Sequence, residues 1–532
     1  MTAGLPCPAR SPCPACPARP PRLALIVAAL VASPACLHRP VANPNVLVVA
    51  VASAPNNLDP RVAADDVSQK AAQLIYNGLM TFDEKLRVVP DLAERLDNPE
   101  PTKYVVTLRR GVRFHDGHEL TSADVAYTFR SLLEPGFVTP HRGAFQLLES
   151  IGTPGRYTVV FRLKEPFGSF PVTLVLPQIV PDGASRSLRE RPIGTGPYRF
   201  VSYAVDDHLN LAAYEDYFRG RPRNDGIVLK VVPDNIMAGL ELRKGTTDIV
   251  VNDLPPDIIA QLERDDRLAT TRSPGVDYQY IGLNIRDPAL KDVRVRQAIG
   301  YAIDRKAIID YLRRGMAIPA TGILPPISWA FDPDTFSFSY DPAKARALLD
   351  EAGYTDPDGE GPAPRLHLTL KMSSIEFNRL QGAVVQQNLR AVGIDLDVRT
   401  YEFATLFADV QVGNFQLYVL QWTGGAVADP DMLRRVFHSD QTPPAGFNRG
   451  RFSDPRVDRL LDEATTSTDD ARRRTLYNQA QRLIAEQAPY ISLWCKTNVV
   501  VAQRDLQGIH PLPTVDFAFL KDVVRQPPPA DH

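Results

Sequence analysis

Residues Tyr280 to Gly315 read YIGLNIRDPALKDVRVRQAIGYAIDRKAIIDYLRRG, and this stretch decides the fold. Its first residues are aromatic or β-branched, so they predict a strand on a half-buried pleated surface. Apolar residues at helical spacing then predict a helix. Its expected buried face is Val295, Ala298, Ile299, Ala302 and Ile303, and its expected outward face is Arg294, Arg296 and Gln297. Asp304 is placed to cap a second helix and Gly315 to end it, and we expect the strand to cross between two lobes.

The length of the chain bounds its architecture. It has 532 residues, more than one hydrophobic core usually fills, which predicts two or more lobes. Apolar residues make up 44% and charged residues 23%, the ordinary range of a globular protein. A net charge of -2 argues against a nucleic-acid partner, which would need a basic face. The 48 prolines favour turns and edge strands over a helical bundle.

The chain begins with a predicted secretion signal. Arginines precede Leu23 to Ala32, an unbroken apolar run of ten residues. This run is too short to span a bilayer, which takes roughly 20 residues. Cys36 then follows a small residue, which resembles a bacterial lipobox, although Ser33 stands where leucine is usual. Two alternatives stay open: Cys36 is the lipidated first residue of the mature protein, or a signal peptidase cuts near Ala35 without lipidation.

The cysteines predict an exported chain without disulfides. Cys7, Cys13 and Cys16 lie in the leader, where their C-x2-C spacing has no second ligand pair for zinc. The mature chain keeps Cys36 and Cys495 only. If Cys36 carries lipid, Cys495 has no cysteine to pair with.

Strand and helix patterns alternate along the rest of the chain. Predicted strands are Asn45–Ser53, Tyr104–Leu108, Ile227–Val232, Asp248–Val251, Leu366–Leu370, Gln416–Trp422 and Ile491–Val501. Predicted helices are Gln69–Leu79 (ending at Gly78), Asn235–Lys244, Phe377–Val392 and Thr468–Gln487, the last capped by Thr468. Thr121 and Asp124 form a capping box, and Asp341 caps a helix that Gly353 stops. Gly194-Thr195-Gly196 opens no helix, so we interpret it as a tight connection rather than a dinucleotide loop.

Four segments together resemble a known family. YVVTLRRGVRFHDGHELTSADVAYTFRSLL, IGTGPY, LNIRDPALKDVRVRQAIGYAIDR and YDPAKARALLDEAGY occur in the order seen in ABC-transporter solute-binding proteins of the oligopeptide/dipeptide type, family 5. The resemblance runs from about Asn45 to about Val501. It implies an α/β fold of two lobes, a type II periplasmic binding protein with mixed sheets and a ligand cleft between the lobes.

The resemblance also implies how the chain is divided. Residues 1–36 would be the signal peptide with its lipobox, and 37–45 a tether. Residues 46–276 and 491–525 would form lobe I, and 277–490 lobe II. Residues 526–532 read as a loose tail, because their composition cannot build a core.

The implied function is that of an extracytoplasmic substrate-binding protein of an ABC importer. It would bind a peptide or another small polar solute by hinge closure, deliver it to a permease, and work as a lipid-anchored monomer on the outer side of the cytoplasmic membrane. We expect no catalysis, no cofactor and no metal. Relatives also carry nickel complexes, haem, opines and sugars, so the resemblance does not identify the ligand. An exported hydrolase is an alternative, although the sequence holds no G-x-S-x-G, H-E-x-x-H or P-loop. A ligand-sensing receptor without transport is another.

The loop after Gln421 is the expected ligand contact. Family members of the peptide type hold an aspartate there for the ligand's ammonium group, whereas this chain has Gly424 and Gly425 after Trp422. Asp429 comes later and is either a ligand contact or an ordinary Asp-Pro turn. Trp422 is either a cleft wall or core.

Six further residues have a structural and a functional interpretation. Tyr280 and Asn284 flank the crossing strand and are expected at the ligand, with packing and structural hydrogen bonds as the alternative. His115 and His118 flank an Asp-Gly turn, which disfavours a metal site. Arg449 and Arg451 could meet a carboxylate, but a solvated turn is the favoured interpretation of their loop.

Overall fold

The structure, a computed structural model, describes residues 43–184, 186–359, 361–514 and 516–526. The predicted leader with Cys36 lies outside the described residues, as does the tail beyond residue 526. Within the described residues no helix is long and apolar enough to cross a membrane.

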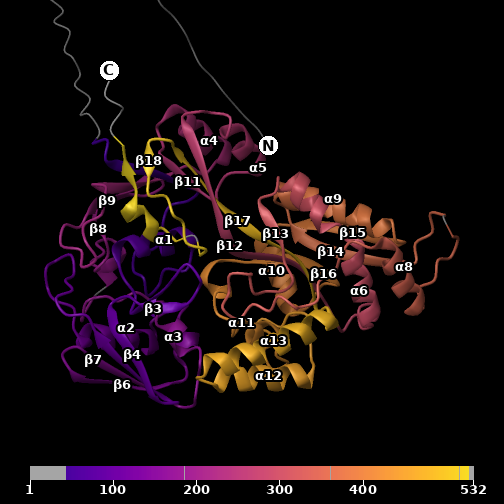
Figure 1. Cartoon of the computed structure of the whole chain (residues 1–532), viewed down its shortest axis with the longest axis horizontal. Coiled ribbons are helices and arrows are strands. Elements are labelled where there is room, and N and C mark those ends of the chain that lie inside the picture. The colour runs from indigo at the N-terminus through magenta and orange to yellow at the C-terminus, as the bar shows by residue number, and fades with distance from the viewer. Residues whose placement is uncertain (1–42, 185, 360, 515, 527–532) are drawn as a thin grey trace, which may run out of the picture. The chain divides into compact units, whose positions relative to one another are not determined.

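In the described part of the chain, eleven strands form one mixed sheet, in the order β15-β14-β16-β12-β17-β11-β1-β10-β9-β8, with β13 beside β17 (Figure 1). Their bounds are β1 Val46–Val51, β8 Tyr198–Ala204, β9 His208–Ala213, β10 Gly226–Val231, β11 Ile249–Val251, β12 Leu268–Leu283, β13 Ala317–Pro319, β14 Leu366–Ser373, β15 Ile394–Tyr401, β16 Leu417–Trp422 and β17 Tyr490–Gln503. Parallel and antiparallel pairs both occur, so the predicted mixed α/β sheet is confirmed.

Two long antiparallel strands, β12 and β17, join the two halves of this sheet. The first part of β12 pairs with the last part of β17, which also pairs with β11. The second part of β12 pairs with β16 and with the first part of β17, where Gly282 lies opposite Tyr490. The chain therefore passes from one half of the sheet to the other and returns beside itself, as the sequence predicted.

β12 is longer than the predicted strand, because it begins at Leu268 rather than near Tyr280. The strand continues through Pro274 and Gly275, and its register with β17 is irregular between Pro274 and Tyr278. A Cβ atom on Gly275 would lie 2.3 Å from the carbonyl oxygen of Lys496, so only glycine permits this close approach of the two strands.

A second sheet builds a separate core. Its four strands run in the order β4-β5-β7-β6 and pack against α2 around Phe129, Phe161 and Phe170. We call these strands with α2 and α3 the small-sheet body. The bounds are β4 Ala93–Glu100, β5 Lys103–Leu108, β6 Leu148–Gly155, β7 Thr158–Leu163, α2 Ser122–Leu133 and α3 Phe170–Thr173. A hairpin of β2 (Met80–Phe82) and β3 (Val88–Pro90) precedes it.

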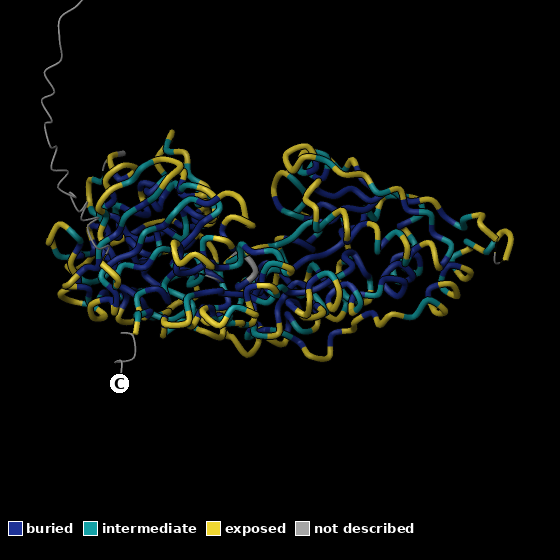
Figure 2. Tube along the Cα trace, turned by 90° about the horizontal axis from the view of Figure 1, so that it is seen from above, coloured by how far each residue is buried: buried dark blue, intermediate teal, exposed yellow. Residues whose placement is uncertain are grey.

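Helices and strands share hydrophobic cores, and Figure 2 shows buried residues in the interior of the trace and exposed residues at its periphery. Helices α11 (Met432–Phe437), α12 (Pro455–Thr466) and α13 (Asp470–Gln487) share one core, and we call them the helical body. The other helices are α1 Asp66–Ile75, α4 Asn235–Lys244, α5 Pro256–Leu262, α6 Val293–Ala302, α7 Arg305–Ala307 followed by a π-turn Ile308–Leu312, α8 Pro342–Glu351, α9 Glu376–Arg390 and α10 Phe403–Val412. A short ladder joins β18 (Leu506–Gln507) to β19 (Val524–Arg525).

Local capping signals are confirmed in three places. Thr121 and Asp124 form the capping box of α2, Asp304 accepts from Ala307 N at α7, and Asp341 accepts from Lys344 N at α8. The Gly194–Gly196 connection leads into strand β8 and not into a helix, as expected.

Three local predictions are wrong. Asp469, not Thr468, caps α13, because its carboxylate accepts from Ala471 N and Arg472 N. Helix α1 ends at Ile75, before Gly78, where a Cβ atom would lie 2.6 Å from the carbonyl oxygen of Val175. Arg296 points inward rather than outward and is 3% exposed. Its guanidinium donates to the carbonyls of Leu290, Lys291 and Gln487, a tertiary contact that helical periodicity does not reveal.

Candidate functional site

Four aromatic side chains stack on one face of the crossing strands. The Tyr280 ring lies 4.0 Å from the Tyr490 ring at 12°, 5.5 Å from Tyr278 and 6.4 Å from Trp422, measured between centroids. Residues two apart on a strand share a face, and so do residues directly opposite each other across an antiparallel pair. Tyr278 is opposite Trp422, so the register of β12 and β16 builds this stack.

Trp422 lies half-buried at the end of β16, where the loop begins. Its ring centroid is 5.1 Å from that of Phe447. Among the residues that the structure describes, the indole Nε1–H has no hydrogen-bond partner. A buried donor without a partner is unfavourable by about 1–3 kcal/mol, so this N–H is available to an acceptor on a ligand.

Arg449 is buried rather than solvated, which overturns the favoured interpretation of its loop. It is 4% exposed, and its guanidinium lies 5.0 Å from the Trp422 ring centroid and 5.5 Å from that of Phe447. Asn448 closes the loop inward by donating to the carbonyls of His438 and Phe452. Burial opposes the charge of Arg449, but the neighbouring hydroxyls of Tyr280, Tyr490 and Tyr418 raise its pKa overall.

Asp277 ties the loop after Trp422 to strand β12. One carboxylate oxygen accepts from Gly424 N at 3.1 Å, and the other accepts from the Gln421 side-chain amide at 3.1 Å. Lys496 on β17 lies 3.7 Å from the same carboxylate. The loop that has glycines in place of an acid is therefore held against a carboxylate that comes from a different strand.

Arg313, at the end of the π-turn, was not identified from the sequence. It donates to the Gln279 side chain at 3.0 Å and lies 4.2 Å from the Phe377 ring and 4.9 Å from the Trp494 ring. Its Nε–H has no partner among the described residues. Burial lowers the pKa of Arg313 to about 10, and the charge of Asp277 opposes this. The segment Leu312–Gly315 reads as an ordinary helix end, so no sequence signal marked it.

Charged groups from distant parts of the chain surround Lys496. Lys70 on α1, Asp253 after β11, Asp277 and Arg313 all interact electrostatically with it. We call these five residues the charged cluster. Burial lowers the pKa of Lys496, and burial raises the pKa of Asp253. Both signs of charge thus meet where β12 and β17 pass from one half of the sheet to the other.

Asp429 and Asn284 make protein contacts away from this cluster. Asp429 accepts from the Ser169 hydroxyl at 3.1 Å and from Asp431 N at 3.2 Å. Burial and the neighbouring Asp431 raise the pKa of Asp429 to about 6, while Arg473 opposes the shift. The Asn284 amide donates to the carbonyl of Phe415 at 3.0 Å. The structure thus brings together Trp422 and Tyr280 but not Asp429.

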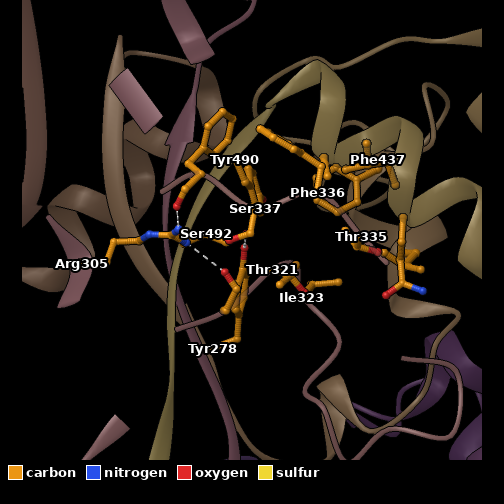
Figure 3. Close-up of a pocket in the computed structure, with 17 residues that line it drawn as sticks. Tyr278, Arg305, Thr321, Ile323, Thr335, Phe336, Ser337, Phe437, Tyr490 and Ser492 are labelled. Atoms are coloured by element: carbon orange, nitrogen blue, oxygen red, sulfur yellow. Dashed lines mark hydrogen bonds between the residues drawn. The ribbon is translucent and has the colours of Figure 1, made fainter. Parts of the chain in front are cut away.

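A small cavity beside the crossing strands has a volume of about 30 Å³ (Figure 3). Arg305 donates there to the carbonyl of Ser492 at 3.0 Å and to the Ser337 hydroxyl at 3.1 Å. Tyr278 and Ser492 share a hydrogen bond of 2.7 Å between their hydroxyl oxygens. This cavity is too small for a peptide.

The two histidines around Asp116 make structural contacts at this turn. His115 contacts the carbonyl of Gly196 at 3.0 Å, and His118 contacts the carboxylate of Asp116 at 2.6 Å. Desolvation lowers the pKa of His115 to about 4. The described residues hold no group of three or more His, Cys, Asp or Glu side chains suited to a metal ion.

Comparison with known proteins identifies the family to which this chain belongs. Residues 87–444 match the model of bacterial extracellular solute-binding proteins, family 5. The chain is 31% identical over 509 residues to the glutathione-binding protein GsiB of Pectobacterium atrosepticum, covering 93% of this chain and 96% of GsiB. It is 30% identical over 486 residues to the oligopeptide-binding protein AppA of Bacillus subtilis, covering 87% and 88%.

Solved structures agree with the sequence matches. The structure of AppA from Bacillus subtilis with a nonapeptide superposes with a TM-score of 0.74 at 28% identity, over 90% of this chain and 99% of AppA. HbpA2 from Haemophilus parasuis gives a TM-score of 0.78 at 26% identity, over 90% of this chain and 100% of HbpA2. The chain therefore belongs to family 5 of the bacterial extracellular solute-binding proteins.

Proposed function

We propose that this protein binds a short peptide or a peptide-like solute between two lobes and delivers it to an ABC permease. One observation carries the proposal: charged groups of both signs meet at the two crossing strands. A peptide carries an ammonium and a carboxylate group, and each is favoured by a partly desolvated opposite charge. The proposed lobe boundaries are 46–276 with 491–525 for lobe I and 277–490 for lobe II.

The proposed contacts follow from the free donors and charges. Trp422 would form a wall of the cleft, with the Tyr280 ring behind it. Asp277 would attract a ligand cation, and Lys496 and Arg313 would attract its carboxylate. Ligand contacts at Asp429 and Asn284 stay predictions, since both side chains bond to protein groups in this structure.

The names of the relatives support a peptide-like ligand. GsiB is a glutathione-binding protein, AppA is an oligopeptide-binding protein, and glutathione carries charges of both signs. We therefore expect glutathione and short peptides to be the first solutes to test, with binding and not chemical conversion as the activity.

Native mass spectrometry of freshly purified protein tests the proposal, because a closed cleft retains its ligand. Titration calorimetry with glutathione, a tripeptide set and a nonapeptide then gives affinities. A retained peptide-like mass, or binding of one of these solutes, supports the proposal. A retained solute of another class without any peptide binding overturns the ligand class. Conversion of the solute at enzyme-like rates overturns the binding function.

We also propose that the chain is exported as a monomer and anchored by lipid on Cys36. The apolar run before Cys36 and the family membership support this. Metabolic labelling with a palmitate analogue should mark the wild type and not Cys36→Ser. Equal labelling of both would refute lipidation at this residue, and light scattering of the released protein tests its monomeric state.

A further inference from the structure

The loop Phe167–Ser169 of the small-sheet body inserts into the helical body. Gly168 N donates to the carbonyl of Thr465, at the end of α12, at 2.7 Å. The Ser169 hydroxyl accepts from Arg473 Nη2 at 2.6 Å and donates to Asp429 at 3.1 Å. Figure 1 shows α3, which follows this loop, next to α12 and α13. Residues between 260 and 304 positions apart in sequence are thereby joined by three hydrogen bonds.

Gly168 fits because it has no side chain. A Cβ atom there would lie 1.9 Å from the carbonyl oxygen of Ser467 and 3.1 Å from Arg473 Nε. Cβ contacts below 3.0 Å do not occur in proteins without movement of one partner. Because the obstructing oxygen belongs to the backbone, any larger residue at 168 forces the two bodies apart.

The helical body presents a polar recess that Ser169 completes. Arg473 is 5% exposed and Ser169 is fully buried. Asp431 accepts from the Thr465 hydroxyl at 2.5 Å, beside Asp429. If the loop withdrew, Arg473 Nη2 and Asp429 would each lose a hydrogen bond to the hydroxyl of Ser169.

The recess shares a loop with the proposed ligand wall. Trp422 begins this loop and Asp429 lies seven positions later. Near its start, Gly424 N is held by Asp277, and a Cβ atom on Gly425 would lie 3.8 Å from the Phe82 ring of hairpin β2–β3. Other parts of the chain therefore hold this loop near both ends.

We propose that Phe167–Ser169 and the recess of Asp429, Thr465 and Arg473 form a latch that holds the two bodies closed without ligand. This inference rests on the proposed hinge closure. Each hydrogen bond stabilises the closed form by roughly two- to tenfold, so three together shift the open–closed equilibrium by about 10- to 1000-fold. Ligand at Trp422 would act on a protein that already favours closure, which raises apparent affinity.

The test compares Gly168→Ala with Gly143→Ala, since a Cβ atom on Gly143 meets nothing within 4 Å. Solution X-ray scattering of the ligand-free full-length protein should give a larger radius of gyration for Gly168→Ala only. Hydrogen exchange of the peptide covering residues 165–170 should be about tenfold faster or more in that variant. A wild-type radius and wild-type exchange in Gly168→Ala would overturn the latch.

A second variant keeps the test decisive if Gly168→Ala does not fold. Ser169→Ala removes one oxygen and two of the three hydrogen bonds, and should accelerate exchange at Gly168 while circular dichroism stays that of the wild type. Unchanged exchange in Ser169→Ala would contradict the latch even if Gly168→Ala does not fold. These measurements use no ligand. Failure of the peptide proposal therefore leaves them intact, and a failed latch leaves the binding titrations intact.

Discussion

Replacing Trp422 by phenylalanine separates ligand binding from core packing. The ring that stacks on Tyr280 and Phe447 is kept, whereas the indole N–H, which has no partner among the described residues, is lost. Because phenylalanine is smaller than tryptophan, this change should destabilise the protein by about 1–2 kcal/mol, less than truncation to alanine. If a ligand acceptor bonds to that N–H, affinity falls by the value of one hydrogen bond, about three- to tenfold.

Trp422→Ala should affect both properties. It removes two aromatic contacts, each about 0.5–1.5 kcal/mol, and the Arg449 contact of about 0.5–2 kcal/mol. The ligand-free protein should therefore lose about 2–4 kcal/mol and melt roughly 2–4 °C lower, because the unfolding entropy of so long a chain is large. This loss differs from a simple cleft wall, whose removal would leave the melting temperature unchanged.

The assay is calorimetric titration with glutathione, or with the peptide found by native mass spectrometry, together with thermal unfolding of the ligand-free protein. Tyr198→Phe is the matched control, because its buried hydroxyl bonds to Asn224 at 2.9 Å in another core. It should lose about 1 kcal/mol of stability and keep its affinity. Wild-type affinity in both Trp422 variants would refute a role of Trp422 in the cleft.

Three further outcomes are expected. The pKa of Asp429 is raised to about 6, so the folded protein holds this proton more tightly than the unfolded chain does. The protonated Asp429 therefore stabilises the fold fully below its ordinary pKa near 3.8, and this stabilisation is lost as the pH rises through 6. The charged or titratable groups that face this carboxylate are Asp431, Arg473 and Tyr477. In chemical unfolding, the difference in free energy of unfolding between wild type and Asp429→Asn should change by up to about 2 kcal/mol from pH 4 to 7. A difference that stays constant over this range would contradict the raised pKa of Asp429. Gly282→Ala should destabilise the protein by about 1–3 kcal/mol, because its Cβ atom would lie 2.3 Å from the Tyr418 ring. Gly322→Ala is the control, because a Cβ atom on Gly322 meets nothing within 4 Å. Equal urea midpoints for these two variants would contradict the close packing at Gly282. Burial raises the pKa of the Cys495 thiol to about 12. Iodoacetamide at pH 8 should therefore modify Cys495 only after the protein is denatured. Rapid labelling of Cys495 in the native protein would show instead that the thiol is accessible.

The parts of the fold that depend on neighbouring residues were predictable. Asp304 and Asp341 cap helices because each carboxylate accepts a hydrogen bond from the free backbone N–H three residues later. This contact is local and does not depend on where the helix lies in the fold. Apolar periodicity likewise placed the strands and most helices. Boundaries were missed where tertiary contacts compete: α1 stops before Gly78 because the chain must pass close to Val175, and β12 continues through Pro274 because β17 pairs with it.

The sequence by itself determined the mixed α/β fold, the return of the chain beside Tyr280 and the lack of an acid directly after Trp422. Only the tertiary structure decided which charges are buried. Arg449 and Arg313 look like surface residues in sequence, but distant aromatic rings enclose both. Asp429 meets Ser169 across 260 positions, and Asp277 reaches the glycine loop from another strand. Capping and periodicity act over a few residues, whereas desolvation and charge pairing depend on groups that only folding brings within a few ångströms.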